Sequence, residues 1–132
     1  MADVTPIKKL LVANRGEIAR RIMRTAHDMG ISTVAIFAEG DARAPFVNEA
    51  DTAIFLEGRT STETYLDVEK VINACKRSGA DAVHPGYGFL SENEGFAQAI
   101  IDAGIKWIGP SPEVIGLMGD KLSAKNLMTE AG

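Results

Sequence analysis

The chain has 132 residues, of which 45% are hydrophobic and 24% are charged, and its formal net charge at pH 7 is −4. This length suits one ordinary globular domain, and the composition is that of a folded protein rather than a disordered one. The negative charge argues against general binding to nucleic acid or to an anionic membrane surface, and no apolar run is long enough to span a bilayer.

The cysteine content narrows the class of protein further. A single cysteine, Cys75, excludes an internal disulfide, and with two histidines beside it no zinc-ligand spacing can be assembled. Cys75 falls in an apolar helical stripe, which favours a buried core residue over a reactive thiol.

The N-terminal stretch resembles neither a signal peptide nor a transit peptide. We therefore expect a cytoplasmic protein.

Apolar segments of strand length alternate with segments of helical periodicity. Five runs predict strands, at residues 7–13, 32–38, 52–56, 81–84 and 106–109. A polar connection that contains Pro45 separates the second strand from the third. Apolar residues at helical spacing predict helices that end at Gly30, Gly79 and Gly104.

Two capping patterns refine the second half of the chain. Ser91 and Glu94 have the spacing of a capping box at the start of the helix that ends at Gly104. Ser111 followed by Pro112 predicts the start of a short helix, and Asp120 can cap a last one.

This alternation predicts a doubly wound α/β domain with about five parallel strands. Such sheets bind ligands outside the carboxyl ends of their strands. The segments NRGE, HPGYGFLSEN and GPSPE each follow a predicted strand. We therefore expect these three segments to line one edge of the sheet.

The segment NRGEIA, residues 14–19, contains one glycine and so lacks the three-glycine fingerprint of dinucleotide-binding folds. The simpler interpretation is a strand-to-helix turn. In that turn Asn14 caps the helix, and Glu17 is favourably placed near the positive end of the helix dipole.

The helix that follows carries Arg20, Arg21 and Arg24. These side chains suit a solvated face, on which Arg24 and Asp28 have the spacing of an ion pair. They equally suit a surface that meets acidic groups of a partner subunit.

The segment HPGYGFLSEN, residues 84–93, combines the residues of a sharp turn. Gly86 and Gly88 let the backbone turn around Tyr87, while a proline fixes the exit from the strand. A ligand-binding loop and a purely structural loop would share this composition. His84 fits a hydrogen-bonded residue at a strand end better than a catalytic base, because no second member of a proton relay is evident.

The stretch MGDK places Lys121 just inside a helix, where a cation is unfavourable against the helix dipole. A phosphate group held by the helix N-terminus and the ammonium would explain this placement. A solvated surface lysine is the alternative.

Four segments together carry a family resemblance: LVANRGEIARRI, AVHPGYGFLSEN, WIGP and LMGDK. They resemble the N-terminal domain of biotin carboxylase, the ATP-dependent component of acetyl-CoA, propionyl-CoA and pyruvate carboxylases. The resemblance begins at about residue 7 and continues to the end of the chain. It implies a Rossmann-like domain over residues 1–117 and the truncated start of an ATP-grasp region over residues 118–132.

The resemblance also implies a reaction and its cofactors. The full enzyme would use ATP, Mg²⁺ and bicarbonate to carboxylate biotin on a biotin carboxyl carrier, and would work with a carboxyltransferase component. Lys121 would contact an ATP phosphate, and Tyr87 and Gly88 would lie at the biotin side of the cleft. The metal ligands and most catalytic residues would lie beyond this chain. Arg21, Arg24 and Asp28 would form a homodimer contact.

Two alternatives remain open at the level of sequence. The chain could be a non-catalytic dimerisation or interaction module, or the front domain of another ATP-grasp ligase. The glycine-flanked tyrosine argues against the other ligases. We do not expect the fragment to turn over alone, and the sequence does not indicate which acceptor receives the carboxyl group.

Overall fold

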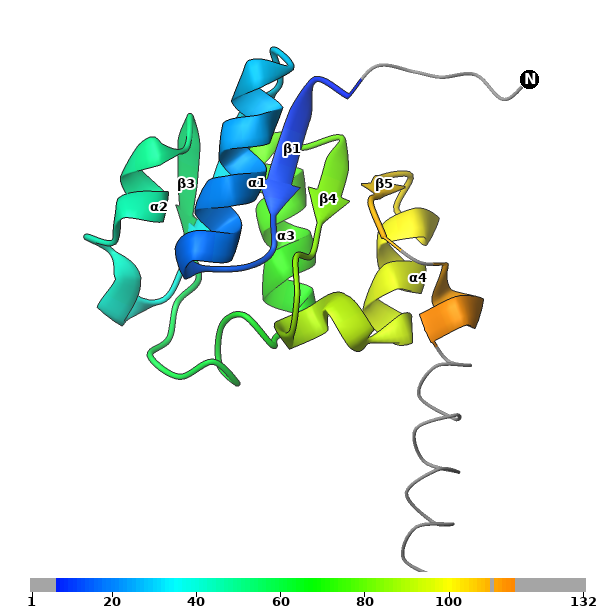
Figure 1. The fold of residues 1–132 in the computed structure, drawn as a ribbon. Coiled ribbons are helices and arrows are strands. Elements are labelled where there is room, and N and C mark those ends of the chain that lie inside the picture. The colour runs from blue at the N-terminus through cyan, green and yellow to red at the C-terminus, as the bar shows by residue number, and fades with distance from the viewer. Residues whose placement is uncertain (1–6, 110, 116–132) are drawn as a thin grey trace, which may run out of the picture.

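The computed structural model describes residues 7–109 and 111–115 as a single sheet with helices on both faces (Figure 1). The strands are β1 (Lys9–Val12), β2 (Ser32–Phe37), β3 (Thr52–Phe55), β4 (Ala82–His84) and β5 (Lys106–Trp107). The helices are α1 (Gly16–Asp28), α2 (Pro45–Glu49), α3 (Val68–Ser78) and α4 (Glu94–Asp102). Two 3₁₀ turns, η1 (Glu39–Asp41) and η2 (Phe89–Glu92), complete these elements.

All five strands are parallel, and their order across the sheet is β3-β2-β1-β4-β5. The predicted doubly wound α/β architecture with about five strands is confirmed, and each strand lies within the run that predicted it. The proposed domain boundary between residues 117 and 118 lies outside the described residues.

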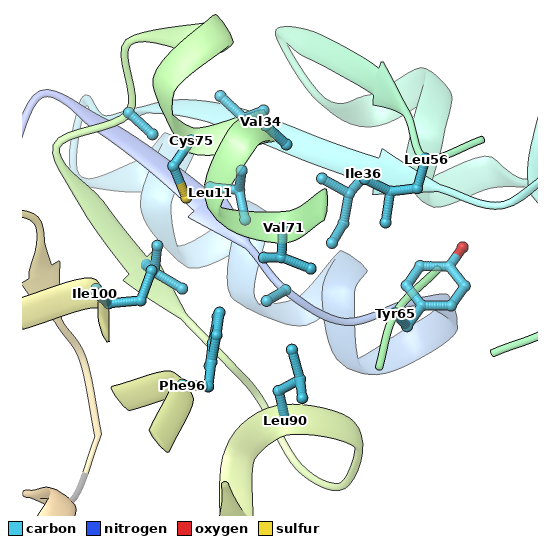
Figure 2. Close-up of a cluster of buried hydrophobic side chains, with 14 of the residues drawn as sticks. Leu11, Val34, Ile36, Leu56, Tyr65, Val71, Cys75, Leu90, Phe96 and Ile100 are labelled. Carbon is cyan, nitrogen blue, oxygen red and sulfur yellow. The ribbon is translucent and has the colours of Figure 1, made fainter. Parts of the chain in front are cut away.

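Side chains of β1 alternate between two hydrophobic clusters, as the pleat of a strand requires. Leu11 packs with α3 and α4 on one face, in a cluster that includes Val71 and Phe96 (Figure 2). Leu10 and Val12 pack with α1 and α2 on the other face. The central strand is therefore buried on both sides, as expected for a parallel sheet covered by helices.

Two local features differ from the sequence prediction. The connection around Pro45 forms α2, with the proline in its first turn and Phe46 and Val47 buried against the sheet. The residue that caps α4 is Asn93, whose Oδ1 accepts a hydrogen bond from the N–H of Phe96 at 2.9 Å. The predicted capping box at Ser91 is wrong, because that residue belongs to the 3₁₀ turn η2.

Other ends of helices follow the prediction. Gly79 adopts the left-handed conformation after α3, with φ 73°. The hydroxyl of Ser111 accepts a hydrogen bond from the N–H of Val114 at 3.3 Å, and residues 112–115 are helical, as predicted.

The strand order determines which loops become neighbours. From β1 the chain adds β2 and β3 on one side, and it then returns to add β4 and β5 on the other side. The loops that follow β1 and β4 consequently lie side by side at the carboxyl edge of the sheet. This switch point is where open α/β sheets bind their ligands.

Candidate functional site

Asn14 connects the two loops at the switch point. Its side chain is buried, and its Nδ2 donates hydrogen bonds to the carbonyls of Pro85 at 2.8 Å and Tyr87 at 2.7 Å. Its Oδ1 accepts from the N–H of Arg15 at 2.9 Å. The prediction that Asn14 caps the first helix is wrong, since the N-cap residue of α1 is Arg15.

The loop that Asn14 contacts has an unusual backbone. Gly86 and Gly88 have φ values of 64° and 70°, and Phe89 has a φ of 47°. A Cβ added at Gly86 would lie 2.7 Å from Nδ2 of Asn14, whereas one added at Gly88 would meet nothing within 4 Å. The first glycine therefore allows close packing within the protein, and only the second leaves space that a ligand can use.

Tyr87 lies between these glycines and is 79% exposed. Its ring is not part of either hydrophobic cluster. An aromatic ring presented to solvent at the carboxyl edge of a sheet is suited to stacking against a flat ligand.

His84 is the last residue of β4 and stabilises the start of the same loop. Its Nδ1 accepts a hydrogen bond from the N–H of Gly86 at 3.0 Å, which confirms a hydrogen-bonded histidine at the strand end. Burial lowers the pKa of the imidazole below its ordinary value. The ring is therefore neutral at pH 7, with Nδ1 as an acceptor.

An apolar groove of about 500 Å³ lies beside α1 and reaches the Tyr87 loop. Ile18, Ile22 and Met29 line one part of it, and His84, Tyr87 and Ile108 line another. Arg21 also borders this groove. The structure thus brings together Tyr87, predicted for the biotin side, and Arg21, predicted for a dimer contact.

All three residues of the predicted dimer surface, Arg21, Arg24 and Asp28, are exposed on α1. The side chain of Arg21 is 77% exposed, and its Nε lies 3.9 Å from a carboxylate oxygen of Glu17. Arg24 and Asp28 are exposed, but the ion pairs of the described residues do not include one between them. Arg24 instead borders a small cavity that Glu49 also lines.

A polar cluster that the sequence analysis missed lies on the other side of the β1–α1 turn. The guanidinium of Arg15 donates to Asp41, with Nε–Oδ2 and Nη2–Oδ1 distances of 2.7 and 2.6 Å. The hydroxyl of Tyr65 donates to the same carboxylate at 2.5 Å and accepts from the N–H of Ala38 at 3.1 Å. In the sequence, Arg15 and Asp41 each lie shortly after a predicted strand. The two strands are neighbours in the sheet, so the two side chains can meet.

The electrostatics of this cluster follow from its contacts. The hydrogen bonds from the guanidinium of Arg15 hold the pKa of Asp41 below its ordinary value, although burial opposes this effect. Burial, and then the hydrogen bond to Asp41, raise the pKa of Tyr65. The carboxylate is therefore ionised and the phenol protonated at neutral pH.

The described residues contain neither a cluster of metal-binding side chains nor a membrane-spanning helix. In that part of the chain no group of three histidine, cysteine, aspartate or glutamate side chains could hold a metal ion. No helix there has both the length and the apolar character needed to cross a membrane. Lys121, predicted to contact ATP, lies outside the described residues.

Known proteins are similar to this chain along nearly all of it. The acyl-coenzyme A carboxylase alpha3 subunit of Mycobacterium leprae, a biotin-dependent protein, is 56% identical over 95% of this chain and 21% of its own length. The biotin carboxylase of Halalkalibacterium halodurans is 50% identical over 95% of this chain and 28% of its own length.

Solved structures show the same relationship. The crystal structure of K. lactis urea amidolyase matches 96% of this chain and 8% of that chain, with 47% identity and a TM-score of 0.87. This chain spans less than a third of the length of these three proteins. Residues 6–115 match the family described as biotin carboxylase, N-terminal domain, and the chain belongs to this family.

Proposed function

We propose that this chain is the first part of an ATP-dependent ligase that carboxylates biotin with bicarbonate, and that its Tyr87–Gly88 loop forms one wall of the biotin site. The family membership and the two relatives described as biotin-dependent or as biotin carboxylase support the reaction. The exposed ring of Tyr87 beside the open backbone of Gly88 is the observation that carries the assignment of the loop.

The groups present fit a flat, largely apolar ring system. Tyr87 offers an aromatic face, Gly88 leaves the main chain accessible, and the groove beside them is lined mainly by aliphatic side chains. When bound, biotin supplies the ureido nitrogen that accepts the carboxyl group. The role that we assign to this chain at that step is to hold and orient the ring.

The nucleotide side of the reaction is assigned to residues outside the described part. We propose that Lys121 contacts an ATP phosphate as a positive point charge. The described residues offer no set of carboxylates for Mg²⁺, so we assign no step to a metal held by them. The ATP-grasp region, the carrier and the carboxyltransferase are proposed as parts or partners of the longer enzyme, which we place in the cytoplasm.

Substitution of Tyr87 in the full-length enzyme tests the proposed wall of the biotin site. Tyr87→Ala is expected to raise the KM for free biotin about two- to tenfold, because one aromatic face contributes on the order of 0.5–1.5 kcal/mol. The KM for ATP should not change. Phe55→Ala is the matched control, because Phe55 is an exposed aromatic residue of β3, away from the loop. Equal changes in both KM values for Tyr87→Ala would contradict the assignment.

A second role is subunit association through the exposed face of α1. Arg21 and Arg24 lie on this face, and Met29 after the helix is 70% exposed next to the groove. Arginine beside exposed apolar surface is typical of protein interfaces. We propose that this face, with Asp28, forms a homodimer contact in the full enzyme. This contact would be the main role of the chain if it acted only as an interaction module.

A further inference from the structure

We propose that Asn14 is a positioning residue for the biotin-side loop: its carboxamide fixes the backbone of residues 85–88 so that Tyr87 and Gly88 face the ligand. This inference rests on the proposed function of that loop. It assigns a role to the asparagine of the NRGE segment, whose sequence pattern suggested only a helix cap.

The hydrogen bonds of Asn14 are directed almost entirely at this loop. A carboxamide has two N–H donors, and here they reach the carbonyls of Pro85 and Tyr87. The carboxamide oxygen accepts from the next residue of its own chain, which fixes the orientation of the group. Asn14 is only 1% exposed, so water does not compete for these bonds.

The loop needs an external support because its conformation is costly. Among the described residues other than glycine, Phe89 alone has a positive φ, and two of the three residues before it are glycines with positive φ. A strained backbone persists only where its surroundings determine it. Phe89 and Leu90 anchor the far end of the loop in the core, but the ring of Tyr87 is too exposed to support residues 85–88, which are held through their main chain.

Shape complementarity reinforces the hydrogen bonds. The Cα of Gly86 lies so close to Asn14 that a Cβ would be 2.7 Å from Nδ2 and 2.9 Å from a methyl carbon of Ile18. Asparagine therefore fills the space under the loop while it donates to both sides of Gly86. Aspartate would fill the same space, but its carboxylate would face two carbonyl oxygens without a proton to share.

The test uses the full-length enzyme with Asn14→Ala, and with Thr33→Val as a matched control. Thr33 is also fully buried, and its hydroxyl is also hydrogen-bonded to neighbouring residues, with two bonds to Asp51 and one to the ring of His27. Thr33 lies near the start of β2, at the amino end of the strands, whereas the Tyr87 loop lies at their carboxyl end. Loss of stability alone would affect both variants, whereas loss of loop positioning would affect only the first.

Two measurements are made on each variant. Hydrogen exchange followed by mass spectrometry reports the protection of residues 84–90, and steady-state kinetics report the KM values for free biotin and ATP. For Asn14→Ala we expect exchange in this segment to accelerate and the KM for biotin to rise about tenfold, while the KM for ATP stays within about twofold, a tenfold change being about 1.4 kcal/mol. Thr33→Val should change neither the loop exchange nor the biotin KM.

The outcomes separate this inference from the proposed function. Unchanged exchange in residues 84–90 of Asn14→Ala would overturn the positioning role, whatever the kinetics. Faster exchange with equal effects on biotin and ATP would uphold the positioning role and contradict the location of the biotin site. If Asn14→Ala does not fold, Asn14→Ser keeps one donor on a shorter side chain. The serine variant should then show an intermediate rise in loop exchange, and exchange like that of the parent would overturn the inference.

Discussion

The side chains of Arg15 and Asp41 form a two-point ion pair that joins the turn after β1 to the turn after β2, with N–O distances of 2.7 and 2.6 Å. Tyr65 completes the cluster from the segment before α3. Arg15 also lies over the ring of Tyr65, with its guanidinium carbon 5.9 Å from the ring centroid. These contacts stabilise the half of the carboxyl edge that is opposite the Tyr87 loop.

Replacement of Asp41 by asparagine should lower the free energy of unfolding of the chain by about 1–2 kcal/mol, because Arg15 and Tyr65 lose a charged acceptor. The effect is smaller than for a fully buried pair, since the side chain of Arg15 is 47% exposed. Urea unfolding monitored by the fluorescence of Trp107, the single tryptophan, measures it. Glu39→Gln is the control, because it breaks an exposed ion pair to Arg59 and should have no measurable effect.

The same pair predicts a dependence of stability on pH. The pKa of Asp41 is lowered in the folded state, chiefly by the hydrogen bond from Arg15, so its stabilisation is present above the unfolded pKa of about 3.9. The stability difference between parent and Asp41→Asn should be constant above about pH 5 and shrink as the pH falls through the lowered pKa. A difference that persists unchanged at pH 2 would contradict the ionic origin.

Cys75 should be unreactive as long as the chain is folded. Its side chain is buried between α3 and the sheet, and burial raises the pKa of the thiol to about 12. At pH 8 the thiol should therefore resist a disulfide reagent such as DTNB, and react completely once urea unfolds the chain. Stoichiometric labelling within minutes without denaturant would show that α3 opens readily.

Reversal of charge at Arg24 tests the proposed dimer contact. Arg24→Glu in the full-length enzyme is expected to raise the dissociation constant of the dimer at least about tenfold, as measured by sedimentation velocity over a concentration series. Lys76→Glu serves as the control, because Lys76 is exposed on α3, on the opposite face of the sheet. If the two variants dissociate alike, the contact lies elsewhere.

Lys121→Ala in the full-length enzyme tests the proposed phosphate contact. Removal of the ammonium should raise the KM for ATP about tenfold and slow ATP hydrolysis that depends on bicarbonate. Lys125→Ala, four residues later, removes a charge from the same stretch of sequence and should have little effect. Hydrolysis by Lys121→Ala as fast as by the parent would contradict the assigned role.

The sequence predicted the elements of the sheet because each is marked by local signals. Strands buried on both faces are continuous apolar runs, and glycine marks the ends of α1 and α3. The α2 helix was missed because five residues are too few for a helical periodicity to show. The capping box failed because its spacing also occurs in the 3₁₀ turn before α4.

The site was predicted less completely because its contacts join distant parts of the chain. The composition of the turn around Tyr87 and Gly88 fits a ligand-binding loop and a structural loop alike, so their assignment to the biotin side rests on the family resemblance and stays a prediction. The partners of Asn14 and Arg15 depend on strand order, which the local pattern does not specify. For that reason asparagine at the end of β1 suggested a cap, although its side chain contacts residues 71 and 73 positions away.

The β1–α1 turn has a consequence for attempts to exchange parts of this domain with those of its relatives. Two consecutive residues, Asn14 and Arg15, hold segments on opposite sides of the central strand. If only the Tyr87 loop or only the turn around Asp41 were replaced, the new sequence would face Asn14 or Arg15, whose contacts fit the original segment. Chimeras should therefore carry all three segments as a set, and a donor with a longer turn after β1 would shift both neighbours together.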